Sequence, residues 1–213
     1  MRPWIFGARA LPEQERFARE VRELCSAALS LEHPEPALEE ITLALAGARR
    51  RIAAAGPADQ RPRVGDLAGG EGRVYLDHGR DVGAFNPMFP VYRIEVESPS
   101  RATGTVRFPL CYEGPPGLVH GGFLAVFADC AVQHHNCAAG LTGRTRGLEL
   151  RYRRPVPVLA DLEFTIDRTV RDGSVHSELS LTRDGAPLCT ATTSAVAGDH
   201  AKLPTVSPRR RRA

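Results

Sequence analysis

The segment from Gly121 to Ala139 constrains the fold more than any other part of the chain, because it is apolar on nearly every side. Its apolar residues as far as Val132 are Phe123, Leu124, Ala125, Val126, Phe127, Ala128, Ala131 and Val132. Gly140 follows, at a position where helices commonly end. A helix that is apolar all round is a buried helix. The run is also too short to cross a bilayer, and Asp129 interrupts it.

Short segments of alternating apolar and polar residues lie on both sides of this helix and predict β-strands. Their apolar positions are Tyr92, Ile94 and Val96; Val106 and Phe108; Leu148, Leu150 and Tyr152; and Leu162, Phe164 and Ile166, with further runs over 175–181 and 188–196. Ser98-Pro99-Ser100 separates the first two, and Asp172-Gly173 and Asp184-Gly185 suit tight hairpin turns. An antiparallel sheet wrapped around one buried central helix is an α+β arrangement, which is the fold class that we predict.

Two helices are predicted before the sheet. The first, within residues 13–31, has an apolar stripe at spacings of three and four: Phe17, Val21, Leu24, Ala28 and Leu31. The second begins at Pro36, ends before Gly56-Pro57 and has its own stripe: Leu38, Ile41 and Leu45. We therefore divide the chain into an N-terminal helical extension (1–56), a linker rich in Gly, Pro, Asp and Arg (57–87), a sheet domain (88–198) and a basic, disordered tail (199–213).

Charge and composition exclude several classes of function. The 213 residues carry a formal net charge of +3, and Arg209 to Arg212 supply four positive charges, so the rest of the chain has a charge of −1, which is +3 less 4. This distribution gives little support to nucleic-acid binding. The five cysteines form no CxxC pair and are expected to be reduced, mostly buried thiols. Since no signal-peptide core and no membrane span are found, we expect a cytoplasmic protein.

The candidate chemistry lies where residues 113–122, with the sequence EGPPGLVHGG, run into the buried helix. Gly121 and Gly122 at the helix start let a ligand approach the bare backbone. N–H groups at such a start have no partner within the helix, and the helix dipole adds positive charge behind them. This arrangement predicts an oxyanion hole, which stabilises the tetrahedral intermediate of acyl transfer by on the order of 3 kcal/mol per donor.

Asp129 is the second candidate group, because an unpaired carboxylate in an apolar helix is costly and must find a partner, be neutral or face a cavity. It lies eight residues after Gly121, which is roughly 12 Å along an α-helix. One carbonyl group cannot contact both, since the base and the oxyanion donor must each lie about 3 Å from the reacting atoms. We therefore predict that two chains related by a two-fold axis each supply half of a site.

Three features in order resemble the hotdog-fold acyl-CoA thioesterases, most closely their phenylacetate-pathway branch. They are GPPGLVHGG, an Asp nine residues after its His, and a Thr sixteen residues after that Asp that opens TRGLELRYRRPVP. The resemblance covers residues 88–197. It implies that Asp129 is a general base or nucleophile, that Gly121 with Gly122 polarises the thioester carbonyl, and that Thr145 holds water or the base, while His120 shapes the turn. It also implies an acyl-CoA substrate and a homodimer or dimer of dimers, and no cofactor is expected.

Four further residues are candidate substrate contacts. Gln133 and His134 follow Asp129 on the same helix, and the guanidinium groups of Arg153 and Arg154 suit the phosphates of coenzyme A. The alternative for His134 is an ordinary polar contact, and for the arginines it is solvated charge. The spacing of Cys130, His134 and Cys137 offers only three loosely placed ligands, so no metal site is predicted.

Two other functions stay open. The segment from Phe85 to Phe89, with the sequence FNPMF, faintly resembles the hydratase branch of the hotdog fold, but Ala84 and Phe89 stand where that branch has an Asp and a His. Hydration of enoyl-CoA is therefore the lesser enzymatic alternative. The other alternative is a non-catalytic acyl-CoA sensor, against which the presence of Asp129 and Thr145 together argues.

Overall fold

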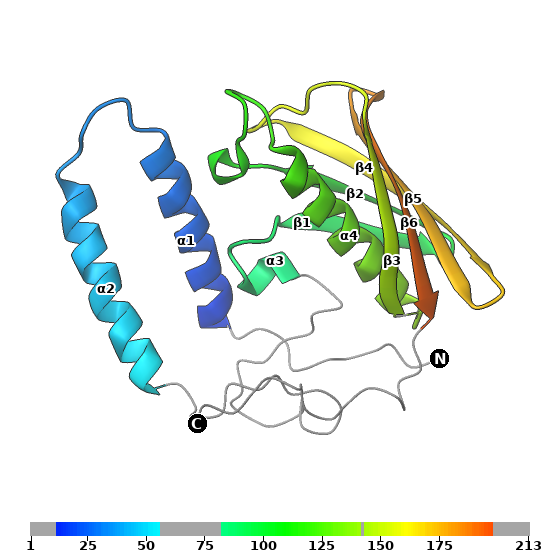
Figure 1. Cartoon of the computed structure of the whole chain (residues 1–213), viewed down its shortest axis with the longest axis horizontal. Coiled ribbons are helices and arrows are strands. Elements are labelled where there is room, and N and C mark those ends of the chain that lie inside the picture. Colours follow the sequence, from blue (N-terminus) through cyan, green and yellow to red (C-terminus); the bar gives the residue numbers. More distant parts are fainter. Residues whose placement is uncertain (1–11, 56–81, 142, 198–213) are drawn as a thin grey trace.

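The computed structural model describes residues 12–55, 82–141 and 143–197. The two N-terminal helices, the central helix and the sheet lie side by side as three layers (Figure 1). The helices are α1 (Pro12–Leu29), α2 (Ala37–Ala55), α3 (Val82–Phe85) and α4 (Gly121–Ala138), with a short 3₁₀ helix η2 (Leu110–Tyr112). The strands are β1 (Tyr92–Ser98), β2 (Arg101–Arg107), β3 (Gly143–Tyr152), β4 (Asp161–Arg171), β5 (Ser174–Arg183) and β6 (Ala186–Ala197). Most of the predicted linker and the whole predicted tail lie outside the described residues.

The strands form one six-stranded sheet in the order β1-β2-β4-β5-β6-β3, in which every neighbouring pair is antiparallel. The predicted hairpins at Asp172-Gly173 and Asp184-Gly185 are confirmed, and all four residues have positive φ between 50° and 76°. Two consecutive residues with positive φ match the right-handed twist of the flanking strands, which is why Asp-Gly is favoured there. The predicted α+β class is therefore confirmed.

The core lies between the concave face of the sheet and α4. Alternation places Leu162, Phe164 and Ile166 of β4 on the inner face, all at most 1% exposed. Phe127 of α4 packs edge-to-face on Phe164 with ring centroids 5.2 Å apart, a geometry that aromatic pairs favour. Tyr92 of β1 contacts both rings in the same way. The predicted helix therefore forms the centre of the core.

The burial of α4 is one-sided, which differs from the expectation of a helix buried all round. Leu124, Ala128 and Ala131 face the sheet and are buried, whereas Val126 and Asp129 on the outer side are only half-buried. No described element covers that outer face extensively. An apolar helix with a half-exposed side leaves room for another chain.

The predicted first helix is confirmed as α1, but its contacts differ from the predicted stripe. The buried residues are Ala18 and Arg22, while Phe17 is 47% exposed. Arg22 Nη1 donates to the carbonyl oxygen of Gly83 at 2.8 Å, which ties α1 to α3. Residues 82–85, expected within the linker, thus form a short helix that the arginine holds in place. Sequence periodicity missed this contact because it weighs only apolar residues.

The cysteines and helices bear on two further expectations. All five cysteines are free, but only Cys137 and Cys189 are buried; Cys25 is exposed, and Cys111 and Cys130 are half-buried. The expectation of mostly buried thiols is therefore wrong in degree.

Among the described helices, none has the length and apolar character needed to cross a membrane.

Candidate active site

The loop before α4 is held by hydrogen bonds among its own residues. Gly114 N–H donates to the carbonyl of Leu118 at 2.9 Å, and the Glu113 carboxylate accepts from Gly117 N–H at 2.6 Å. Gly117 has a φ of 75°, which only glycine adopts without strain. A Cβ on Gly114 would lie 2.9 Å from His120, so this position also requires glycine. The loop therefore delivers His120 to a fixed position at the helix start.

His120 is the N-cap of α4. Its Nδ1 accepts a hydrogen bond from Gly122 N–H at 3.0 Å, and its backbone N–H donates to the carbonyl oxygen of Tyr112 at 2.9 Å. This cap engages one of the free donors that begin every helix. Within the described residues, the N–H of Gly121 has no acceptor. Of the two predicted oxyanion donors, Gly122 is thus engaged by His120, and Gly121 is free to bind an anionic oxygen.

Tyr152 at the end of β3 supports the same turn and was not singled out from the sequence. Its hydroxyl donates to the carbonyl oxygen of Gly121 at 3.2 Å. A Cβ on Gly121 would lie 2.9 Å from that hydroxyl oxygen, so a larger residue would displace the tyrosine side chain. The alternating pattern of β3 revealed Tyr152 as a strand residue, but no local signal connected it to a glycine 31 residues earlier.

Asp129 lies eight residues after Gly121 on α4 and takes part in a chain of hydrogen bonds. Thr145 Oγ1 of β3 donates to Asp129 Oδ1 at 2.7 Å, and Gln133 Nε2 donates to the same threonine oxygen at 2.7 Å. Asp129 is half-buried, and among the described residues no donor reaches Oδ2. One carboxylate oxygen is therefore oriented by the protein, while the other is available to a water molecule or a substrate.

Cys130 and His134 follow Asp129 on α4, and both contact Tyr92 of β1. The hydroxyl of Tyr92 lies 3.3 Å from His134 Nδ1 and donates to the carbonyl of Cys130 at 3.1 Å. Burial, and then the negative charge of Asp129, raise the pKa of the Cys130 thiol to about 12, so this thiol is protonated near neutral pH and unsuited to be a nucleophile. Within the part of the chain that is described, no three metal-ligating side chains are grouped.

A cavity of about 440 Å³ opens beside Gly121. Its walls include Leu118, Leu124 and Tyr152, and Arg153 and Arg154 lie at its rim. Both arginine side chains are exposed, and neither has an ion-pair partner among the described residues. The cavity thus combines an apolar wall, one free backbone donor and two free cations.

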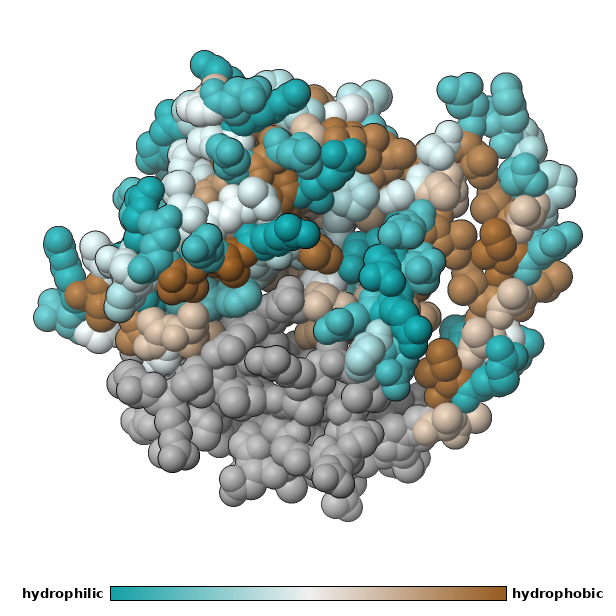
Figure 2. Space-filling model, turned by 180° about the vertical axis from the view of Figure 1, so that it is seen from behind, coloured by the Kyte–Doolittle hydropathy of each residue, from teal (hydrophilic) through white to brown (hydrophobic). Residues whose placement is uncertain are grey.

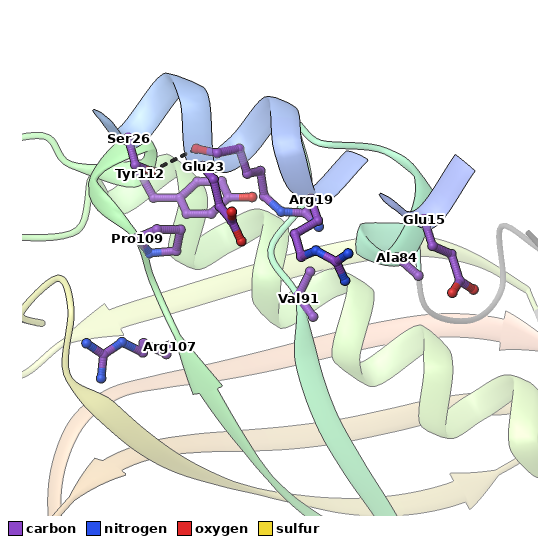
Figure 3. A pocket seen from close by; sticks show the side chains of 10 residues that line it. Glu15, Arg19, Glu23, Ser26, Ala84, Val91, Arg107, Pro109 and Tyr112 are labelled. Carbon is purple, nitrogen blue, oxygen red and sulfur yellow. Dashed lines mark hydrogen bonds between the residues drawn. The ribbon is translucent and has the colours of Figure 1, made fainter. Parts of the chain in front are cut away.

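A second cavity, of about 600 Å³, lies under α1. Figure 3 shows Arg19 pointing from α1 toward Val91, and Glu23 pointing toward Pro109. Its lining alternates acids and bases with apolar side chains, and none of the predicted site residues contributes to it. Asn86 of the hydratase-like segment lies nearby and caps its own turn, since its Oδ1 accepts from Met88 N–H at 3.1 Å.

The structure therefore brings the predicted site residues together in two groups rather than one. Asp129, Thr145 and Gln133 form the first group. Gly121 forms the second, with Arg153 and Arg154 around the same cavity. Eight residues of one rigid helix separate the two groups, as the sequence predicted from helix geometry.

No family model matches the sequence. The structure, however, is similar to that of a thioesterase superfamily protein, with a TM-score of 0.72 and 23% sequence identity over 91% of this chain and 100% of that one. The chain has the hotdog fold. The fold predicted from the resemblance is thus confirmed. Because the aligned region is 91% of this chain, it includes residues outside the predicted sheet domain.

Shorter proteins align over about half of this hotdog chain. One is a hypothetical thioesterase from Streptococcus pneumoniae determined with coenzyme A, with 22% identity over 52% of this chain and 89% of that one and a TM-score of 0.48. Another is the Escherichia coli PaaI protein from the phenylacetic acid degradation operon, with 15% identity over 49% and 82% and a TM-score of 0.46.

Proposed function

We propose that this protein is an acyl-CoA thioesterase, in which Asp129 of one chain and Gly121 of a second chain act on the same thioester. The observation that carries the proposal is the carboxylate of Asp129, oriented through Oδ1 by Thr145 and open at Oδ2. A carboxylate held in this way on a half-buried helix face is suited to activate water. The free N–H of Gly121 is suited to stabilise the oxygen that becomes negative during the reaction.

The need for two chains rests on geometry and on the surfaces that one chain leaves uncovered. A rigid helix separates Gly121 from Asp129 by roughly 12 Å, too far for one carbonyl group. The outer face of α4 is half-exposed, and β3 is an edge of the sheet on which Leu148 and Tyr152 are 37% and 60% exposed. Exposed edge strands of this length are normally covered or paired. A two-fold axis beside α4 and β3 would cover both surfaces and bring Asp129 of each copy to Gly121 of the other.

The reaction then proceeds in two steps. Asp129 Oδ2 accepts a proton from water as the water oxygen attacks the thioester carbon, and the carbonyl oxygen becomes an anion that accepts a hydrogen bond from Gly121 N–H. The tetrahedral intermediate collapses, the carbon–sulfur bond breaks, and Asp129 returns the proton to the leaving thiolate. Direct attack by the carboxylate would instead break the carbon–sulfur bond, release the thiolate and form an acyl-Asp129 anhydride. Water would then hydrolyse the anhydride, and a proton from that water would neutralise the thiolate. Both routes yield a free acid and coenzyme A.

The arginines at the cavity beside Gly121 support a coenzyme A thioester as the substrate class. Arg153 and Arg154 are exposed and close to that backbone donor, and guanidinium groups bind phosphate oxygens with two parallel hydrogen bonds. The apolar wall of Leu118 and Leu124 suits the uncharged part of the same substrate.

The first test is a panel of acyl-CoA thioesters of graded chain length, with free coenzyme A measured by chromatography. We expect release from at least one member, and we expect Asp129→Asn to reduce kcat by about 10²–10⁴-fold, the usual contribution of a general base. Binding of the substrate to the variant should persist. Asp161→Asn, at an exposed position on β4, is the matched control and should leave the rate unchanged.

A water-addition assay with crotonyl-CoA and a binding measurement, made beside this panel, separate the two alternatives. If crotonyl-CoA gained water without releasing thiol, the protein would be a hydratase. If acyl-CoA bound without turnover in both the parent protein and Asp129→Asn, the protein would be a sensor. An unchanged rate in Asp129→Asn would overturn the assignment of the base.

A further inference from the structure

Helix α2 has almost no packing partner within its own chain. None of its residues is buried, and none of the described elements packs extensively against it. Figure 1 shows α2 standing apart on the far side of α1 from α4. A single helix of this length is only marginally stable in water, because most helix stability comes from packing of one face. Another surface is therefore needed to stabilise α2.

The apolar residues of α2 lie on a stripe whose spacing is that of a coiled coil. Successive steps of three, four, three and four residues separate its members, Leu38, Ile41, Leu45, Ala48 and Ile52. This repeat defines the seam between two paired helices. Leu38, Leu45 and Ile52 are 38%, 48% and 62% exposed, and Figure 2 shows apolar surface along this helix at the right of the view. The stripe is therefore exposed at both ends and at its middle, while Ile41 and Ala48 between them are half-buried.

The charges of α2 indicate what covers the stripe. Glu39 and Glu40 lie in its first turn, and Arg49, Arg50 and Arg51 lie toward its end. Within the described residues these side chains form no ion pairs. A parallel copy of the helix would place acid beside acid and base beside base. An antiparallel copy would place each acidic end beside the basic end of the other, so α2 is complementary to itself when reversed.

We propose that α2 is a self-association helix, which pairs antiparallel with α2 of a second copy of this chain about a two-fold axis near Leu45. Because both copies use the same patch, this contact joins two helices and leaves no stripe free to bind a third. Since α1 lies between α2 and α4, this contact is separate from the one proposed at the active site. A chain with two separate two-fold contacts assembles as four copies, a dimer of dimers, when the two axes cross at right angles, and this is the assembly that the proposal assigns.

Disulfide cross-linking of the full-length protein tests the pairing directly and without reference to catalysis. In a Cys25→Ser background, which removes the exposed native thiol, Leu45→Cys places one thiol at the proposed axis. Mild oxidation should join two chains through this residue about tenfold or more faster than through the control, because pairing raises the local thiol concentration. The control is Leu43→Cys, which is 65% exposed but on the opposite side of the helix. Equal rates for the two variants would overturn the proposal.

Light scattering gives a second, independent measurement. We expect four copies for the parent protein and two copies for Leu45→Glu, with the same rate of thiol release per chain, since α2 is remote from the active site. The charge variants Glu39→Arg with Glu40→Arg, and Arg49→Glu with Arg50→Glu and Arg51→Glu, should each also give two copies. A mixture of these two charge variants should again give four copies.

The outcomes separate this proposal from the proposed function. A mass unaffected by Leu45→Glu would overturn the α2 pairing and leave the active-site proposal standing. Cross-linking through Leu45 in a protein that releases no thiol from any acyl-CoA would support the pairing and overturn the thioesterase.

Discussion

At the scale of single residues, the direction of two hydrogen bonds determines how the site is organised. The hydroxyl of Thr145 has one proton to donate. Because Gln133 Nε2 donates to its oxygen, that proton is directed to Asp129 Oδ1. Gln133, which the sequence placed among the substrate contacts, therefore orients the threonine, and we infer that it acts on catalysis through the threonine and the base.

We expect Gln133→Ala to lower kcat by about fivefold with little change in KM, since the lost hydrogen bond to Thr145 is worth about 1 kcal/mol and is not made to the substrate. Thr145→Val should cause at least the same loss. Steady-state kinetics on the best acyl-CoA substrate would measure both effects.

Thr145→Ser is the matched control, because serine keeps the hydroxyl and should retain most of the rate. A direct substrate contact by Gln133 would instead raise KM and leave kcat unchanged. That result would restore the role expected from the sequence.

At the scale of elements, the C-terminal end of α4 is anchored to the sheet by one buried arginine. Arg168 of β4 is 4% exposed and donates to the carbonyl oxygen of His135 at 2.9 Å and to Asn136 Oδ1 at 3.2 Å, and also to the carbonyl of Pro99. A cation at this end complements the helix dipole. Burial, and then the charge of Arg168, lower the pKa of His135, which is therefore neutral near pH 7. One guanidinium thus joins α4 to the β1–β2 turn.

We expect Arg168→Met to reduce the free energy of unfolding by about 2–4 kcal/mol, because it leaves several buried carbonyl groups without a donor. Urea denaturation followed by circular dichroism would measure the loss. Arg171→Met, at an exposed position on the same strand, is the control and should change the stability by less than about 0.5 kcal/mol. Equal stability of the two variants would show that Arg168 is not the anchor.

At the scale of the whole molecule, the central question is whether two incomplete half-sites combine. Asp129 and Gly121 lie on one helix, so under the proposed function each copy would hold both groups but could not use them on one substrate. A homodimer would then have two equivalent sites, each built from both chains.

Mixed dimers test this arrangement. Asp129→Asn and Gly121→Ala should each be inactive alone, the second because its Cβ would displace the Tyr152 hydroxyl from the Gly121 carbonyl and crowd the N–H that the proposal assigns to the substrate oxygen. After coexpression, the mixed dimers should have about half of the parent activity, since each has one intact site of two. Activity of copurified mixed dimers, isolated with two different tags, is the measurement. Failure to regain activity would place each site within one chain.

The sequence by itself determined the class of fold and the order of its elements. Alternation fixed the strands, Asp-Gly fixed two hairpins, and the apolar run from Gly121 fixed the central helix, because each of these signals depends only on residues close together in the chain. The separation of Gly121 from Asp129 followed from the same local geometry.

The tertiary structure decided which distant groups meet. It assigned Gly122 N–H to His120 and brought Tyr152 to Gly121 and Gln133 to Thr145. It also left one side of α4 half-exposed and much of the stripe of α2 exposed. None of these contacts has a periodic signal, since each joins side chains or backbone groups whose proximity depends on how the sheet curves around the helix. Local pattern therefore specifies the elements, and long-range packing specifies the site.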